Sequence, residues 1–219
     1  MLNRIALVCL ILTAARTTEA WSGDRRTGVG GSIGFAFPFG DIRDNPAATF
    51  SPSEEGISET INAEIPVHRK IAVIAGYNSS KFAGHELENK RVTFWEAGFQ
   101  FTNGNADRTW RPFFAVCAGL GKIRTEFDNV HNGQAITNFS ADSGWRPGAK
   151  FCVGVRRAMA KRLDLRIAAE FRMIQIEGEE AELVEETTFA GSTTRRRTTE
   201  LITGNVAMFN LGLGLFFVN

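Results

Sequence analysis

The side chains best able to do chemistry in this 219-residue chain are charged groups set at alternating positions of otherwise apolar segments. Because residues of both signs recur at every second position, each segment carries them on one face only. Opposite charges on one face can pair with one another, line an ion path or hold a polar ligand. An unpaired buried charge is very costly, so we expect a structural network of ion pairs first. The candidate residues are Glu96, Arg146, Lys150, Arg166, Glu170 and Arg172.

The spacing of two neighbouring segments predicts how these charges meet. If residues 157–161 form the turn between them, Lys150 lies opposite Ala168, and Arg146 lies across from Arg172. Residues that are opposite or diagonal on one face of paired strands are within contact distance. We therefore expect both signs of charge to gather in one place.

Two cysteines, Cys117 and Cys152, share the parity of these charged residues on neighbouring segments. With residues 125–143 as the loop between the segments, the two thiols lie nearly opposite one another. They form either a cross-strand disulfide, which demands narrow geometry, or two reduced side chains that fill a small interior. No histidine accompanies them at a comparable depth, so we expect no catalytic thiol.

The three histidines, His68, His85 and His131, are scattered over connecting segments. A hydrolytic or acyl-transfer site needs a histidine beside a hydroxyl and a carboxylate, and only ordinary loop residues such as Ser140 and Asp142 follow His131. No two histidines share a segment, as a metal site would favour, and no glycine-rich phosphate loop occurs. The sequence therefore predicts a protein that is not an enzyme and holds no metal or cofactor.

A group of acidic residues followed by a group of basic residues lies late in the chain: Glu185, Glu186, Arg195, Arg196 and Arg197. A turn at residues 190–192 would bring the two glutamates opposite the first two arginines. The simplest interpretation is a hairpin supported by exposed cross-strand charge pairs. Alternatively, the hairpin offers an adhesive edge to a host protein or surface sugar, or its arginines bind lipopolysaccharide phosphates.

The elements that must position these residues are β-strands, because hydrophobicity alternates with a period of two. Between residues 163 and 173, for example, Leu, Ile, Phe and Met alternate with Asp, Arg and Glu, which gives two chemically opposite faces. Such segments are near the length that a tilted strand needs to cross a bilayer. The eight predicted strands cover residues 29–39, 57–67, 71–80, 91–102, 110–124, 144–156, 163–173 and 205–217.

The connections between these strands alternate in length, which is typical of a transmembrane barrel with short turns on one side and long loops on the other. An eight-stranded barrel has an interior just wide enough for side chains, so the face rich in small and polar residues suits the lumen. The rows of Leu, Phe and Val suit lipid. The alternative is a soluble sandwich or lipocalin-like barrel with its apolar face inward. The short connections are 68–70, 103–109 and 157–161, and the longer ones are 40–56, 81–90, 125–143 and 178–200.

The start of the chain has the features of a secretory signal peptide. Arg4 precedes a compact apolar run that is too short to span a membrane as a helix, and the small residues Thr18 and Ala20 precede the expected cleavage site. We therefore expect a signal peptide at residues 1–20 and a single barrel domain at residues 21–219. Acidic and basic residues are equally numerous in that domain, which argues against nucleic acid as a partner.

The signal peptide, the eight alternating strands and the terminal stretch Leu211-Gly-Leu-Gly-Leu-Phe-Phe-Val-Asn219 resemble the small outer-membrane β-barrel proteins of the OmpA/OmpX-like, opacity-type group. The resemblance covers essentially the whole mature chain. It implies a monomer in the bacterial outer membrane, in contact with its lipid and lipopolysaccharide. Members of this family usually end on an aromatic residue that the assembly machinery recognises, whereas here Phe217 is followed by two further residues.

The favoured function is that of a non-enzymatic outer-membrane barrel that supports the envelope or binds surface partners through long external loops. One alternative is a narrow, porin-like channel whose conductance depends on Arg166 or Glu170. A second is a barrel enzyme that modifies lipid A with a loop residue such as His131. A third is a soluble extracellular β-protein.

Overall fold

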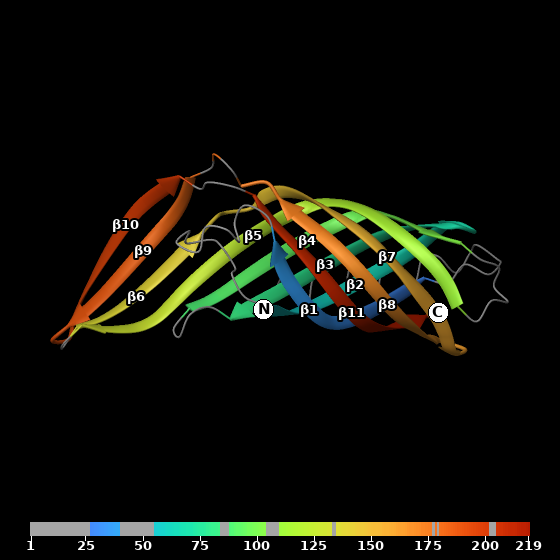
Figure 1. Ribbon diagram of the computed structural model, residues 1–219, viewed down its shortest axis with the longest axis horizontal. Helices are drawn as coiled ribbons and strands as arrows, with labels where there is room; N and C mark the ends of the chain where they lie inside the picture. The colour runs from blue at the N-terminus through green and yellow to red at the C-terminus, as the bar shows by residue number, and fades with distance from the viewer. Residues whose placement is uncertain are drawn as a thin grey trace.

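The computed structural model describes residues 27–39, 55–83, 88–103, 110–132, 135–176, 178, 180–201 and 205–219. The regular elements of these residues are β-strands, joined in one eleven-stranded antiparallel sheet (Figure 1). Among the described residues there is no helix long and apolar enough to cross a membrane. The expected signal peptide at residues 1–20 lies outside the described part of the chain.

Eight of the strands close into a barrel, in the order β5-β4-β3-β2-β1-β11-β8-β7, because β7 pairs with β5 as well as with β8. Closure removes the free edges that an open sheet would expose. Neighbours in the ring follow one another along the chain, so the predicted all-β, eight-stranded antiparallel up-and-down barrel is confirmed. The barrel strands are β1 (Gly28–Phe39), β2 (Gly56–His68), β3 (Ile71–Ala83), β4 (Glu88–Thr102), β5 (Trp110–Asn132), β7 (Arg146–Ala160), β8 (Leu163–Ile174) and β11 (Val206–Val218).

Three further strands lie beside the far end of β5: β6 (Ala135–Asp142), β9 (Glu180–Phe189) and β10 (Ser192–Leu201). They pair in the order β5-β6-β9-β10 and project from one end of the barrel (Figure 1). We call β6, β9, β10 and the part of β5 from Arg124 onward the extension sheet. The expectation of a loop at 125–143 was therefore wrong. Here β5 continues past Arg124 and pairs with β6, starting from Arg124 opposite Asp142.

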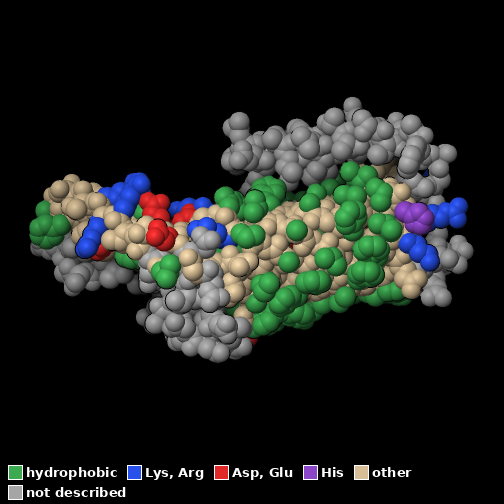
Figure 2. Space-filling view, turned by 90° about the horizontal axis from the view of Figure 1, so that it is seen from above, with side chains coloured by type: hydrophobic (Ala, Val, Ile, Leu, Met, Phe, Trp, Pro, Cys, Tyr) green, Lys and Arg blue, Asp and Glu red, His purple; other side chains and the backbone are tan. Residues whose placement is uncertain are grey.

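The apolar face of the barrel points outward. Phe35 on β1 is 64% exposed and Phe217 on β11 is 65% exposed, and apolar side chains cover the barrel wall in Figure 2. A soluble barrel of the lipocalin type would bury these side chains in its lumen. An outward apolar band is instead what a barrel in lipid requires, as the sequence predicted.

The lumen near the extension sheet is filled by apolar side chains, which we call the plug. Phe94 is fully buried there, and inward-facing glycines leave room for its ring: a Cβ atom on Gly148 would lie 2.6 Å from a ring carbon, and one on Gly121 would lie 2.9 Å from another. Burial of these side chains closes this end of the barrel to water. The plug consists of Ala36, Phe82, Val92, Phe94, Ile123, Ile174, Ile176, Val206 and Met208.

Candidate functional site

Four buried charges meet in the lumen below the plug, and we call them the central cluster: Glu96 of β4, Lys150 of β7, and Glu170 and Arg172 of β8. Glu96 forms an ion pair with Lys150, and its Oε2 atom lies 3.4 Å from Nε of Arg172. Arg172 also lies 2.7 Å from Oε2 of Glu170. Two acids and two bases balance one another, which is what burial of charge requires. The predicted interior network is therefore present in the lumen.

A second group of charges fills the lumen nearer the short turns, and we call it the lower cluster: Glu64, Arg111, Arg156, Asp164 and Arg166. Arg156 joins the two acids, since Nη1 lies 2.7 Å from Glu64 and Nε lies 2.6 Å from Asp164. Arg166 contacts Glu64 at 3.2 Å, and Arg111 contacts Asp164 at 3.3 Å. Both acids are thus held by more than one guanidinium group.

Aromatic rings pack against the lower cluster, and a thiol links it to the central cluster. The guanidinium group of Arg166 lies 4.3 Å from the ring centroid of Phe113 and 5.7 Å from that of Phe216. Such contacts stabilise a cation where water is excluded. Sγ of Cys152 lies 3.6 Å from Arg166 and 3.8 Å from Glu170. The charged part of the lumen is therefore one continuous packed layer.

Five of the six interior residues predicted from sequence lie in these clusters, and four members of the lower cluster were missed. The missed residues had a signal in the sequence: Asp164 has the parity of Arg166, and Arg156 has that of Lys150. Glu64 follows polar residues at the inward positions of β2. The residues missed were Glu64, Arg111, Arg156 and Asp164.

The predicted register of β7 and β8 was wrong by four residues. Lys150 lies opposite Arg172, not opposite Ala168, which instead pairs with Gly154. The cause is the turn: β7 continues to Ala160 through an irregularity after Ala158, so the connection is shorter than the expected 157–161. A shift by an even number preserves parity, which is why the residues still face the lumen.

Arg146 is the predicted residue that does not join the interior network. It pairs across the strands with Gly121 rather than Arg172, at the mouth of the barrel. Its Nε atom donates to the carbonyl oxygen of Ser143 at 2.9 Å, and Nη2 donates to that of Glu180 at 3.1 Å. Because Glu180 begins β9, Arg146 ties the barrel to the extension sheet.

The two cysteines are offset rather than opposite. Cys117 pairs with Lys150, and Cys152 pairs with Ala115, so the predicted near-opposite placement was wrong by two positions. Both thiols are buried and free. Of the two interpretations that the sequence left open, the structure shows reduced side chains that fill the narrow lumen.

Apolar packing fixes the extension sheet to the barrel. Leu183 of β9 and Ala141 of β6 are buried in one cluster with the plug residue Ile176, and Phe139 packs against it. Together with the hydrogen bonds of Arg146, these contacts continue the barrel interior outward into the sheet. The extension sheet is therefore a packed part of the fold.

The hairpin of β9 and β10 has the register that the sequence predicts. Arg195 lies opposite Glu186, and Arg196 lies opposite Glu185, around a turn at Ala190-Gly191 with positive φ at both residues. Arg195 reaches Glu186 at 3.7 Å, and Arg197 reaches Glu182 at 3.2 Å. These pairs are half exposed, so each contributes only a few tenths of a kcal/mol. The predicted surface residues Glu185, Glu186, Arg195, Arg196 and Arg197 thus lie together.

The outer strand of this sheet is β10. Among the described residues it pairs with β9 alone, so its other edge offers a row of free backbone donors and acceptors. Ten residues long and exposed, it carries threonines and three arginines. An edge of this kind can pair with a strand of another chain, and its positive charges select against basic partners.

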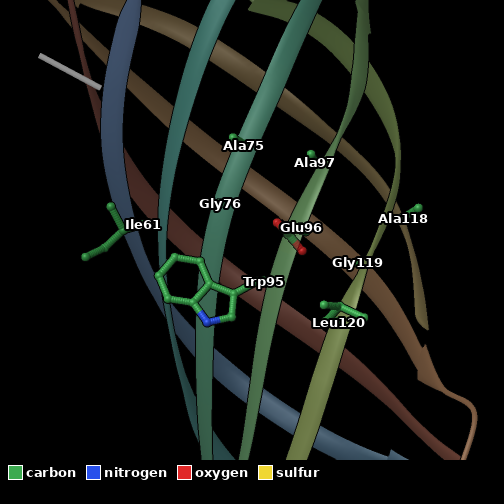
Figure 3. Close-up of a pocket in the computed structure, with 9 residues that line it drawn as sticks. All are labelled: Ile61, Ala75, Gly76, Trp95, Glu96, Ala97, Ala118, Gly119 and Leu120. Carbon is green, nitrogen blue, oxygen red and sulfur yellow. The ribbon is translucent and has the colours of Figure 1, made fainter. Parts of the chain in front are cut away.

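A groove of about 310 Å³ lies on the outer wall of the barrel (Figure 3). Its floor is made of small residues that pair across the strands, Ala75 with Ala97 and Ala97 with Ala118. Glu96 is among the lining residues, but its carboxylate pairs with Lys150 in the lumen. This apolar hollow suits an acyl chain better than a polar substrate. The larger side chains around it are those of Ile61, Trp95 and Leu120.

The histidines bring no reactive group together in the described part of the chain. His68 is the last residue of β2, beside the turn to β3, and its Nδ1 accepts a hydrogen bond from the backbone of Lys70. His85 and the side chain of His131 lie outside the described part. Within that part, no three His, Cys, Asp or Glu side chains are placed to hold a metal ion.

Comparisons with known proteins identify the architecture. No protein-family model and no curated relative matches the sequence. Neisserial surface protein A, from Neisseria, is 13% identical, with a TM-score of 0.56 over 87% of this chain and 96% of that one. A major outer membrane protein from Thermus thermophilus is 9% identical, with a TM-score of 0.60 over 88% and 99%. The chain has the fold of the small outer-membrane β-barrels.

This fold by itself assigns no activity, because barrels of one architecture serve different roles. What distinguishes this small outer-membrane-type barrel is its own side chains. Its lumen is closed by the plug and two charge clusters, and its extension sheet presents the free edge of β10.

Proposed function

We propose that this protein is a non-enzymatic component of the bacterial outer membrane that binds partners at the cell surface through its extension sheet. The observation that carries the proposal is the division of the molecule into a filled barrel and a projecting sheet with a free edge. A filled lumen offers no room for a substrate, whereas an exposed edge strand is a template for another chain. The barrel then serves as the anchor of the sheet.

The membrane location rests on two features of the chain. The outward apolar band needs lipid around it, and the fold is shared with two proteins described as surface or outer-membrane proteins. The signal peptide expected at residues 1–20 would provide export. Lipid and lipopolysaccharide are then the immediate neighbours of the barrel wall.

The proposed mode of binding is the addition of a strand to β10. Main-chain hydrogen bonds would supply the affinity, and the arginines would favour a partner segment with acidic side chains. Arg195 and Arg197 already pair with glutamates of β9, whereas no ion pair joins Arg196 to another described residue. Arg196 is therefore the first candidate for contact with the partner.

The location is tested by an epitope tag inserted between Ala190 and Gly191 at the tip of the hairpin. An antibody should label this tag on intact cells. The control carries the tag between Lys161 and Arg162 in the short turn, where labelling should require permeabilised cells. The opposite pattern would overturn the proposal, as would a protein that leaves the membrane fraction without detergent and shows no heat-modifiable migration in gels.

The binding role is tested by replacing residues 180–201 with a short Gly-Ser connection. The barrel ring closes without these residues, so the variant should keep its heat-modifiable migration. Cells that express it should lose adherence to host cells or immobilised extracellular protein relative to the full chain. Unchanged adherence combined with greater sensitivity to detergents would indicate a role in envelope support instead.

A further inference from the structure

A second charged surface lies at the opposite end of the barrel, where the short turns connect the strands. Exposed basic residues lie at two of these connections: Arg69 and Lys70 between β2 and β3, and Arg157 and Arg162 around the turn from β7 to β8. Figure 2 shows Lys, Arg and His side chains at this end of the barrel. We call these four residues the basic rim.

No exposed Asp or Glu side chain near the basic rim balances its positive charge in the described part of the chain. The acids closest to this end, Glu64 and Asp164, face the lumen and are already paired with Arg111, Arg156 and Arg166. The extension sheet differs, because its arginines stand beside glutamates of β9. The described residues at the two ends of the molecule thus differ in net charge.

The basic rim begins where the apolar band ends. Arg157 occupies an outward position of β7, two residues beyond Val155 and four beyond Val153, which is 60% exposed. It pairs across the strands with Trp110 of β5, and its guanidinium group lies 5.3 Å from the Trp110 ring centroid. Tryptophan and arginine at such a boundary mark the depth of lipid headgroups.

The two basic connections are close enough to form one surface. Only β1 and β11 separate β2 from β8 in the ring. Neighbouring strands are about 4.8 Å apart, so the two connections lie roughly 15 Å from one another along the rim. Arginine and lysine bind phosphate oxygens by charge-assisted hydrogen bonds, and an anionic membrane surface attracts each such residue.

We propose that the basic rim binds the phosphate groups of anionic phospholipids, such as phosphatidylglycerol, in the leaflet on the side of the short turns. The proposal rests on the membrane location proposed above, but not on the partner of the extension sheet. The site selects lipids by headgroup charge and fixes the depth of the barrel in the bilayer. Each basic residue near an anionic surface contributes a factor of about five in affinity.

The test uses the full chain refolded in vesicles of phosphatidylcholine with and without phosphatidylglycerol, followed by native mass spectrometry of the lipids that remain bound. The wild-type protein should retain phosphatidylglycerol over phosphatidylcholine by about 10-fold or more. The variant Arg69→Gln, Arg157→Gln, Arg162→Gln should lose most of this preference. The matched control Arg195→Gln, Arg196→Gln, Arg197→Gln removes the same charge from the extension sheet and should keep the preference for phosphatidylglycerol.

Each other outcome has a defined meaning. Equal retention of both lipids by the wild-type protein overturns the proposal, as does an equal loss in the two triple variants. Competition by free glycerol phosphate as strong as that by the lipid would indicate a soluble anion site instead. If the wild-type chain does not insert at all, the membrane location itself fails. The single exchange Arg162→Gln in the exposed turn replaces the triple variant if the latter does not fold.

Discussion

At the scale of single residues, Glu96 is the acid that two buried cations share. Lys150 pairs with it from β7 and Arg172 pairs with it from β8, and all three side chains are almost completely buried. Arg172 has Glu170 as a second acid, whereas Lys150 forms its ion pair with Glu96. Removing the charge of Glu96 therefore leaves Lys150 buried without its ion-pair partner, and the cost of that is large.

We expect Glu96→Gln to lower the free energy of unfolding by about 3–5 kcal/mol, the usual cost of breaking a buried ion pair. Urea unfolding of the barrel in lipid vesicles, followed by heat-modifiable migration, measures the change. The control Glu185→Gln lies on the half-exposed face of β9 and should change stability by about 0.5 kcal/mol or less. Equal effects of both exchanges would show that the central cluster does not support the fold.

The sequence predicted which residues face the lumen but not which of them meet. Parity follows from the alternation alone, so Lys150, Glu170 and Arg172 were correctly placed inside. The register of β7 against β8 depends on which residues form the turn between them. The irregularity after Ala158 shifts that turn and cannot be recognised from the hydrophobic pattern. The same limit explains why the relative position of the two cysteines was predicted wrongly. A register error of two positions decides whether Cys117 and Cys152 are opposite or diagonal.

At the scale of elements, the eight barrel strands were predictable because lipid enforces alternation along each of them. The strand β6 was not, because it lies beyond the apolar band and pairs within the extension sheet. In the extension sheet, hydrogen bonding to β5 and β9 decides the conformation of β6, so strict alternation of apolar and polar residues is not required. The hairpin β9–β10 was predictable from its opposed charges and the small residues of its turn.

Leu183 is the residue of β9 that anchors the extension sheet in the plug. We expect Leu183→Ala to loosen the sheet locally, so that trypsin cleaves after Arg195–Arg197 about 10- to 100-fold faster, since loss of a buried leucine costs about 2 kcal/mol or more. The urea midpoint of the barrel should change much less. Limited proteolysis followed by mass spectrometry measures the rate.

The matched control for this exchange is Val184→Ala, which removes a half-buried side chain at the next position of β9. It should speed cleavage by much less than Leu183→Ala. If the two exchanges act equally, the packing of Leu183 does not hold the sheet in place, and the hydrogen bonds of Arg146 to Ser143 and Glu180 become the main attachment.

At the scale of the whole molecule, the lumen is closed by layers of different chemistry in series. The plug blocks the end beside the extension sheet, and the central and lower clusters block the rest. The lumen of an eight-stranded barrel has room for side chains only. The plug alone, or the charged clusters alone, is therefore sufficient to stop ions. This arrangement opposes the alternative of a narrow channel, which the sequence alone left open.

We therefore expect the wild-type barrel to give no resolved single-channel current in planar bilayers. Phe94→Ala should also give none, although it opens the plug, because the ion pairs of Glu96, Lys150 and Arg172 still fill the lumen below it. Combining Phe94→Ala with Glu96→Ala should still give no current, because the ion pairs of the lower cluster fill the lumen nearer the short turns. Regular steps from the wild-type protein that disappear on exchange of Arg166 or Glu170 would instead establish a channel through the charged clusters, and the barrel would then be more than an anchor.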